Sequence, residues 1–397
     1  MSDEGKRRPI VPFSFSALIF LEALSKKIRG CKEAASYPDL LTFSFYCRRA
    51  NLETIKNSYD GMEHRLGRGL LFHIAPSNVP INFAYSYVFG LLAGNENVVR
   101  VSTKDFPQVD LLCRLMEELF MEPAFEEIGR RTRIIRYDRS QEINDYFSSI
   151  CNGRIIWGGD ETIQQVRRSP LPVRSIEITF ADRYSLGIVS PKAILSMDEE
   201  AITQLARDFY NDTYLMDQNA CTTPHLIVWK VEEELARAEV LQAKNRFWES
   251  IYKQAERYDL ADIKVSEKYE LLCELACEKM AIQEIKQYGN RLYRISLSSL
   301  FVEGRTMDIT QYRGSFGLFF EAEIKEYAEL LPHLFEKVQT IATKGVDPQE
   351  IRDFIETKGV MGVDRIVPFG KTLDIGTIWD GYDLIRTLSR VITVVER

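Results

Sequence analysis

The feature that most constrains this fold is an alternation of short apolar runs and amphipathic segments between residues 69 and 180. The apolar runs have strand length and are Gly69–Ala75, Val98–Val101, Arg133–Tyr137, Arg154–Trp157 and Arg174–Phe180. The segments between them have helical spacing and are a segment ending at Ala93–Asn95, then Phe106–Met121, Gln141–Ile150 and Glu161–Arg168. This alternation predicts a parallel sheet covered by helices on both faces, a doubly wound α/β architecture. Such sheets bind ligands beyond the carboxyl ends of their strands, which directs attention to the loops that follow these runs.

The rest of the chain continues the α/β pattern less regularly. Residues 1–66 look mainly helical. Beyond residue 185 we predict strands at Leu186–Val189 and His225–Trp229 and a helix at Glu199–Tyr210. A long charged helix is expected from Val231 to about Glu256, with its side chains facing solvent. We therefore expect four parts, with the bounds 1–66, 67–184, 185–363 and 364–397.

Composition narrows the class of protein. The chain has 397 residues, of which 45% are hydrophobic and 27% charged, and this balance is typical of a globular protein. A net charge of −7 argues against binding nucleic acid. Neither a membrane-spanning segment nor a leader is visible, and the seven scattered cysteines do not suggest a disulfide framework. We expect a reduced, cytoplasmic protein without membrane insertion.

The loop after the first predicted strand is the first candidate site. It reads His73–Pro80, and either Ser77 or Asn78 is a suitable N-cap for the helix that follows. Pro80 suits the first helical turn, where its missing N–H would have no partner. The simple interpretation is a capped helix start. The functional interpretation is a helix N-terminus that faces a ligand, with the Asn78 amide able to donate to an oxyanion.

The loops after two other strands are also candidates. The second strand leads into Arg100, Ser102, Thr103 and Lys104, which offer hydroxyls and cations with no acidic side chain before Asp105. A basic residue there favours the 2′-phosphate of NADP(H) over the bare ribose of NAD(H), although basic strand ends are common. The pair Gly158–Gly159 follows another strand and allows close backbone approach to a ligand, but it can equally be only a tight turn.

Cys221 is the candidate nucleophile. It lies in the polar, turn-prone segment Asp217–Pro224, directly before a predicted strand. Structural cysteines usually lie in apolar runs, whereas a cysteine among amides and hydroxyls can keep a solvated, reactive thiolate. Composition and spacing leave both roles open.

Taken in order, these stretches resemble the LuxC-type fatty acyl-CoA reductases within the aldehyde dehydrogenase superfamily. The resemblance is carried by His73–Pro80 with the helix ending Phe89–Asn95, by Gln218–Cys221, and by the C-terminal runs Asp364–Gly370 and Trp379–Arg390. It covers residues from about 67 to 390. It implies two doubly wound α/β domains with a site in the crevice between them. Residues 67–184 would bind the nicotinamide cofactor, residues 185–363 would carry the catalytic cysteine, and residues 364–397 would return to the cofactor domain.

The resemblance also implies a reaction and a role for each candidate residue. Cys221 would take the acyl group from acyl-CoA or another acyl thioester, and Asn78 would stabilise the oxyanion. NADPH, or alternatively NADH, would reduce the acyl group to an aldehyde. The cofactor would be bound by Ser77, by Arg100 and Ser102–Lys104, and by Gly158–Gly159. The implied partners are acyl-CoA or an acyl-carrying or acyl-transferring protein, and we expect a homo-oligomer.

Two alternatives remain open at this point. An NAD(P)-dependent aldehyde dehydrogenase that oxidises an aldehyde to an acid needs a general base, and Glu177 stands where such a base could fall. The simpler interpretation of Glu177 is a strand carboxylate paired with Arg174 or Arg183. The other alternative is an inactive scaffold that docks an acyl-transferring partner. The four histidines share no ligand spacing, so we predict no metal.

Overall fold

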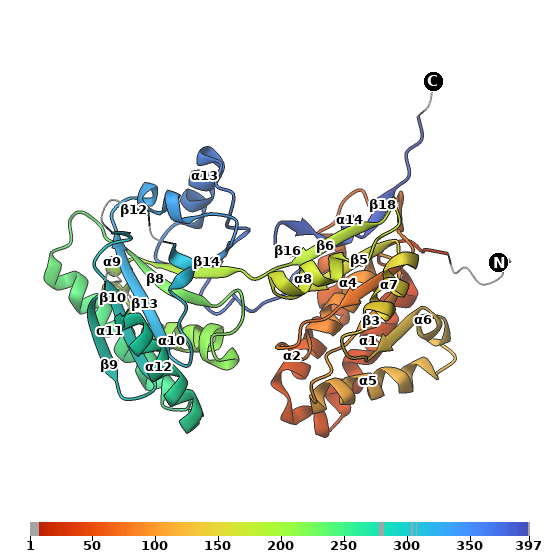
Figure 1. Cartoon of the computed structure of the whole chain (residues 1–397), viewed down its shortest axis with the longest axis horizontal. Helices are drawn as coiled ribbons and strands as arrows, with labels where there is room; N and C mark the ends of the chain where they lie inside the picture. The colour runs from red at the N-terminus through yellow and green to blue at the C-terminus, as the bar shows by residue number, and fades with distance from the viewer. Residues whose placement is uncertain (1–7, 278–281, 303–304, 307, 396–397) are drawn as a thin grey trace. The chain divides into compact units, whose positions relative to one another are not determined.

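The computed structural model describes residues 8–277, 282–302, 305–306 and 308–395. Residues 1–7, where we expected no leader, lie outside this range. The chain divides into two compact units, which are described separately below (Figure 1). Unit 1 comprises Met1–Asp182 with Ile375–Arg397, and unit 2 comprises Arg183–Asp374.

Unit 1 is built on a five-stranded parallel sheet with the order β4-β3-β2-β5-β6. Its strands are β2 (Leu70–Ile74), β3 (Glu96–Arg100), β4 (Thr132–Ile135), β5 (Gly153–Trp157) and β6 (Ile176–Phe180). They fall within about two residues of the five predicted runs. The central strands are the most buried, because both of their faces are covered, and this explains why their sequences are continuously apolar.

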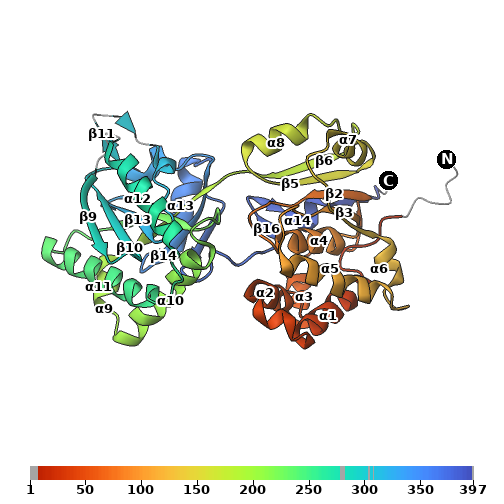
Figure 2. The same cartoon turned by 60° about the horizontal axis from the view of Figure 1, so that its bottom comes forward.

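Helices cover both faces of this sheet (Figure 2). They are α4 (Asn82–Leu92), α5 (Pro107–Phe120), α6 (Glu126–Arg130), α7 (Gln141–Ile150) and α8 (Asp160–Arg167). Side chains such as Leu71 and Ile155 point to the face of α4 and α5, and their neighbours Phe72 and Ile156 point to the face of α7 and α8. All eleven residues of α4 are buried.

The two ends of the chain complete unit 1. The N-terminal helices are α1 (Phe15–Gly30), α2 (Pro38–Tyr46) and α3 (Arg49–Asn57), preceding the short strand β1 (Arg65–Gly67). Their apolar faces join the same core as α4 and α5. The C-terminal elements are β16 (Ile378–Trp379), β17 (Tyr382–Asp383), α14 (Leu384–Thr387) and β18 (Ser389–Val391). Strand β18 pairs antiparallel with β1, so the last part of the chain belongs to the first unit.

Unit 2 contains a seven-stranded sheet with the order β15-β14-β7-β8-β13-β10-β9. All neighbours are parallel except β9, which runs antiparallel to β10. The strands are β7 (Tyr184–Val189), β8 (Pro224–Lys230), β9 (Ile282–Tyr288), β10 (Leu292–Leu297), β13 (Leu318–Ile324), β14 (Val338–Lys344) and β15 (Arg365–Pro368). The helices are α9 (Pro191–Ser196), α10 (Glu199–Thr213), α11 (Arg237–Ala255), α12 (Asp262–Cys277) and α13 (Pro348–Lys358).

The predicted helix from Val231 needs two corrections. It begins at Arg237, because Val231 still pairs with β13 and the Glu239 carboxylate accepts from the backbone N–H of Ala236, which fixes the helix start there. It is also not simply a solvent-facing helix, since one face buries Phe247 and Trp248 against the sheet. Its charged residues lie at positions between these apolar ones, and this masked the buried stripe in the sequence.

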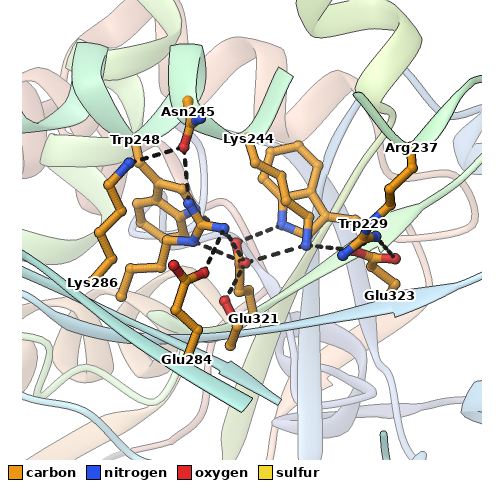
Figure 3. Close-up of polar contacts among 11 residues, drawn as sticks. Trp229, Arg237, Lys244, Asn245, Trp248, Glu284, Lys286, Glu321 and Glu323 are labelled. Carbon is orange, nitrogen blue, oxygen red and sulfur yellow. Dashed lines mark hydrogen bonds and ion pairs between the residues drawn. The ribbon is translucent and has the colours of Figure 1, made fainter. Parts of the chain in front are cut away.

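A buried ionic cluster joins α11 to the sheet of unit 2 (Figure 3). At its centre is Glu321 of β13, which is fully buried and receives hydrogen bonds from Arg294, Ser296, Lys244 and the indole nitrogens of two tryptophans. Burial opposes ionisation of Glu321, but its charged neighbours outweigh that effect and hold the pKa of the carboxyl below its usual range. Both oxygens of the Glu321 carboxylate are therefore used in holding α11 to the sheet.

Candidate functional site

Cys221 lies in the loop between the short 3-10 helix Tyr214–Met216 and strand β8. The backbone N–H of Thr223 donates to the carbonyl of Ala220 at 2.9 Å, which places Cys221 at the corner of a turn. The Ser185 hydroxyl donates to the carbonyl of Cys221 at 2.7 Å. Cys221 is partly exposed, and all seven cysteines of the chain are thiols without a disulfide. Cys221 thus lies in a partly exposed turn, and its role as a nucleophile stays a prediction.

The two residues that begin this loop adopt an uncommon backbone conformation. Asp217 and Gln218 have φ angles of 52° and 62°, in the left-handed region that non-glycine residues seldom occupy. Gln218 is nevertheless only 2% exposed, with its amide bonded to backbone groups of Gly317 and Leu318. This role is not visible in the sequence, because a glutamine close to a cysteine in a polar loop is normally expected to be exposed.

The loop after β2 corrects the predicted helix start. Helix α4 begins at Asn82, its N-cap is Ile81, and no side chain caps it. Ser77 and Asn78 are therefore not N-caps, because the backbone first makes an additional turn in which Asn82 N–H donates to the carbonyl of Val79. Both side chains are exposed instead, and this leaves them available to a ligand.

The end of β3 presents four predicted cofactor residues in different ways. Thr103 and Lys104 are exposed. Ser102 is buried, and its hydroxyl accepts from the backbone N–H of Lys104 at 3.1 Å, so it shapes the turn. Arg100 lies over the ring of Tyr137, with its guanidinium carbon 5.0 Å from the ring centroid. Only Thr103 and Lys104 are thus fully open to a ligand.

Gly158 and Gly159 connect β5 to α8 without an unusual backbone. Neither has a positive φ, and a Cβ at Gly159 would meet nothing within 4 Å. A Cβ at Gly158 would lie 3.1 Å from the Thr162 side chain, so this position is only moderately crowded. The first turn of α8 carries Asp160 and Glu161. These carboxylates disfavour placing a pyrophosphate at this helix N-terminus.

A buried hydrogen-bond chain supports the residue before this glycine pair. His73 Nδ1 lies 2.8 Å from the Ser86 hydroxyl, and Trp157 Nε1 donates to the same hydroxyl at 3.0 Å. Burial lowers the pKa of His73 to about 4, so the ring is neutral and its Nδ1 can accept from Ser86. The Trp157 ring stacks on Phe180, with centroids 3.7 Å apart. The carboxyl ends of β5 and β6 thus carry a fixed aromatic pair, which the sequence interpretation missed.

Three of the predicted segments share one edge of unit 1. Because β3, β2 and β5 are adjacent and parallel, the residues that follow them lie along the same carboxyl edge of the sheet. Two buried polar atoms at this edge, Asn82 Oδ1 and Arg100 Nε, have no hydrogen-bond partner among the described residues. A nucleotide cofactor fits this edge, because the edge offers exposed hydroxyl, amide and ammonium groups and these two polar atoms whose hydrogen bonds are unmade.

Glu177 lies away from that edge. It is the second residue of β6 and stands beside Arg154 of β5 in the sheet. Its carboxylate accepts from Arg154 at 2.9 Å and from Arg167 at 2.7 Å. The predicted partners are thus wrong, since Arg183 pairs with Asp364 instead. Burial opposes ionisation of Glu177, but the bonds from Arg167 and Arg154 outweigh it, and the pKa of this carboxyl is lowered. Such a group is poorly suited to accepting a proton.

The residues that the structure describes lack two kinds of feature. They contain no group of three or more histidine, cysteine and carboxylate side chains arranged to hold a metal ion. Among the helices in that part of the chain, none has the length and apolarity needed to cross a membrane.

Solved structures similar to this chain are aldehyde dehydrogenases at low identity. Aldehyde dehydrogenase 21 from Physcomitrella patens matches with a TM-score of 0.63 and 10% identity, over 95% of this chain and 85% of that one. The 1-pyrroline-5-carboxylate dehydrogenase of Thermus thermophilus matches with a TM-score of 0.62 and 12% identity, over 97% and 82%. An NAD-dependent benzaldehyde dehydrogenase from Corynebacterium glutamicum matches at 0.59 and 11%, over 96% and 85%. These matches confirm the predicted aldehyde dehydrogenase-like α/β fold.

Sequence comparisons identify the family within that fold. The long-chain acyl-protein thioester reductase of Vibrio harveyi is 22% identical over 335 residues, which are 83% of this chain. This chain covers only 64% of the length of that relative. The model of the family described as acyl-CoA reductase (LuxC) matches residues 39–392, beginning earlier than the stretches from which we recognised the resemblance. The chain therefore belongs to the LuxC acyl-CoA reductase family.

Proposed function

We propose that this protein reduces an acyl thioester to an aldehyde through an acyl-enzyme on Cys221. The single observation that carries the proposal is Cys221 itself, a partly exposed cysteine at the corner of a hydrogen-bonded polar turn, in a chain of the LuxC acyl-CoA reductase family. The relative from Vibrio harveyi is named for the reduction of acyl-protein thioesters, which supports a thioester as the substrate class.

In the first step the Cys221 thiolate attacks the carbonyl carbon of the thioester. The bond to the donor sulfur breaks, the donor leaves as its thiolate, and the acyl group stays on Cys221. Exchange between two thioesters is nearly isoenergetic, so the protein mainly has to orient the groups and stabilise the oxyanion. We propose that the backbone N–H of Cys221 and the side-chain amide of Asn78 donate hydrogen bonds to this oxyanion.

The cofactor, when bound, supplies the hydride that converts the acyl carbon to the aldehyde oxidation level. The protein then stabilises the negative oxygen of the resulting thiohemiacetal until the carbon–sulfur bond breaks, releasing the aldehyde and the Cys221 thiolate. We propose that Ser77, Thr103 and Lys104 bind the cofactor, with Arg100 and Ser102 supporting the end of β3 and Gly158–Gly159 lining the site. The exposed ammonium of Lys104 favours NADPH over NADH.

Oxidation of an aldehyde to an acid is the less favoured function. It requires a base to activate water against the acyl-enzyme, and Glu177 is held by two arginines at the amino half of its strand. An inactive scaffold is also disfavoured, because Cys221 lies partly exposed in a hydrogen-bonded turn and not in the core.

A panel of acyl donors tests the proposed function directly. Acetyl-, octanoyl- and hexadecanoyl-CoA, and hexadecanoyl-acyl carrier protein, are each supplied with NADPH or NADH, and both cofactor consumption and aldehyde formation are measured. We expect at least one donor to yield aldehyde in equal amount to NADPH consumed. Acid formation from aldehyde and NADP⁺ with no reduction of any acyl donor would instead establish the oxidising function.

A further inference from the structure

Two turns with left-handed backbone contact each other through Gln218, three residues before Cys221. The first is Asp217–Gln218, and the second is Phe316–Gly317, where φ is 53° and 89°. Three of these four residues have a Cβ, which makes this conformation unfavourable unless the surroundings impose it. Such backbone tends to persist where structure is held for a functional reason. The contacts that hold both turns are therefore informative.

Gln218 connects the two turns. Its side-chain oxygen accepts from the backbone N–H of Gly317 at 2.6 Å, and its side-chain N–H donates to the carbonyl of Leu318 at 2.9 Å. Its own backbone N–H donates to the carbonyl of Thr213 at the end of α10. With all these groups bonded and the residue buried, Gln218 fixes the point from which the chain proceeds to Cys221.

Helix α12 holds the same two turns from the side through two lysines. Lys264 pairs with the Asp217 carboxylate at 2.9 Å, and the Tyr258 hydroxyl donates to the same oxygen. Four residues further along the helix, the ammonium of Lys268 donates to the carbonyl of Phe316 at 2.9 Å. Lys268 is fully buried, and burial lowers its pKa to about 8. One face of α12 thus contacts both turns.

Downstream, the Cys221 turn is held independently of α12. Ser185 of β7 binds the Cys221 carbonyl, and the Thr223 hydroxyl donates to the carbonyl of Asp212 at 2.9 Å. The two residues between Gln218 and Cys221, Asn219 and Ala220, therefore connect two positions that are each held by hydrogen bonds. Movement of Gln218 would therefore change the orientation of the Cys221 thiol.

We propose that Gln218 and the Lys264–Asp217 pair are positioning residues, through which α12 sets the orientation of the Cys221 thiol for acyl transfer. The proposal rests on the function assigned above to Cys221. The residues do not touch the substrate in this account. They act on the backbone that presents the nucleophile, so their removal should lower the rate of an oriented reaction more than that of an unoriented one.

The test compares four variants with the parent protein. Lys264→Met and Gln218→Met remove the contacts while keeping the length of the side chain, and Lys264→Arg restores the ion pair. Lys192→Met is the matched control, because Lys192 makes an exposed ion pair with Glu234 in the same unit and does not contact the loop. Each protein is first compared in thermal unfolding, so that variants with a folding defect are recognised.

Two readouts separate this proposal from the proposed function. Hydrogen exchange of the peptide covering residues 217–223 reports on the loop and requires no substrate. Acylation of Cys221 by hexadecanoyl-CoA and by p-nitrophenyl octanoate is then compared with its alkylation by iodoacetamide, a small reagent with no oriented geometry.

We expect Lys264→Met and Gln218→Met to speed exchange of residues 217–223 about tenfold and to slow acylation about tenfold, with alkylation changed less than threefold. Lys264→Arg should restore most of both effects, and Lys192→Met should resemble the parent. Unchanged exchange in both variants, or slower exchange, would overturn the positioning role whatever the reaction proves to be. Absence of acylation in the parent would overturn the proposed function, and the exchange data would still decide the position of the loop.

Discussion

The surroundings of each side chain determine which of the candidate residues can act in catalysis. Cys221 and Glu177 are both partly exposed residues next to or within strands, yet their settings differ. The thiol lies at the corner of a turn, whereas the carboxylate is saturated by Arg154 and Arg167. Its lowered pKa keeps Glu177 ionised and paired. Glu177 is therefore poorly placed to act as a base, and Cys221 stays the proposed nucleophile.

Replacing Glu177 tests this assignment. We expect Glu177→Gln to keep acyl reduction within about threefold of the parent, because no step needs this carboxylate as a base. The free energy of unfolding should fall by roughly 2–4 kcal/mol, since Arg154 is only 2% exposed and would lose its counter-charge. Chemical denaturation and steady-state kinetics measure the two effects. Glu234→Gln, at an exposed ion pair, is the control. A loss of activity of a hundredfold or more with unchanged stability would instead make Glu177 catalytic.

His73 should make the stability of unit 1 sensitive to acid. Its pKa is about 4 in the folded protein and near 6.5 when unfolded, so the unfolded chain binds more protons between these values. Stability due to neutral His73 is therefore complete above about pH 6.5 and is lost as the pH falls towards 4, by roughly 3 kcal/mol. Denaturation followed between pH 4 and 7 should show this slope, and His73→Gln should flatten it. An equal slope in that variant would show that other groups cause the acid sensitivity.

At the scale of elements, unit 2 depends on how α11 is attached to its sheet. The helix contributes apolar residues to the core, and it also places Lys244 on the buried carboxylate of Glu321 (Figure 3). Three adjacent strands meet in this cluster through Trp229 of β8, Glu321 of β13 and Arg294 of β10. Shifting α11 along the sheet would leave charges buried without partners, so the cluster fixes the position of the helix.

The loss of stability on replacing a carboxylate of this cluster should depend on how deeply that carboxylate is buried. Glu321→Gln removes the fully buried carboxylate that Lys244 and Arg294 share, and leaves these buried cations only their contacts to the less buried Glu323 and Glu284. The free energy of unfolding should therefore fall by about 3–5 kcal/mol. Glu323→Gln, two residues away on the same strand, removes a carboxylate that is partly exposed and should cost about 1 kcal/mol. Equilibrium denaturation of the two variants gives the comparison. Equal losses at both positions would contradict the account of a buried, charge-balanced cluster.

The elements themselves were largely predictable, and their ends and contacts were not. The five strands and the helices between them in unit 1 follow from short-range periodicity, which the sequence displays directly. The helix starts at Asn82 and Arg237 were missed because a turn and a carboxylate contact displaced them. The partners of Glu177 were missed because they depend on the register of β5 against β6, which local sequence does not specify.

For the candidate site, the sequence indicated which segments carry it, but not the buried hydrogen bonds that hold those segments in place. The residues after β2, β3 and β5 were predictable because parallel strands end at one edge. The buried contacts of Gln218 and the His73–Ser86–Trp157 chain join residues far apart in the chain, so no local pattern reveals them. Cys221 was found in the sequence only as a candidate nucleophile, and the family resemblance singled it out.

At the scale of the whole molecule, the chain combines a proposed cofactor unit with a unit that carries the thiol. We propose that unit 1 determines which cofactor is used. A substitution there should therefore change cofactor preference without changing acyl transfer to Cys221 in unit 2. We expect Lys104→Ala to lower the preference for NADPH over NADH by about tenfold, as expected for losing one charge-assisted bond to a phosphate. Ratios of kcat/KM for the two cofactors measure it, and Lys56→Ala, on α3, is the control. An unchanged ratio would remove Lys104 from the cofactor site.

Acyl transfer to Cys221 is the central step of the proposed mechanism, and mass spectrometry of the acylated protein tests it most directly. The parent and Cys221→Ala are incubated with hexadecanoyl-CoA and the other acyl donors without cofactor, digested and analysed. We predict one acyl group on the peptide containing Cys221 in the parent, its loss with aldehyde release when NADPH is added, and no adduct or reduction in Cys221→Ala. Acylation of a different residue, or reduction by Cys221→Ala at the parent rate, would contradict the mechanism.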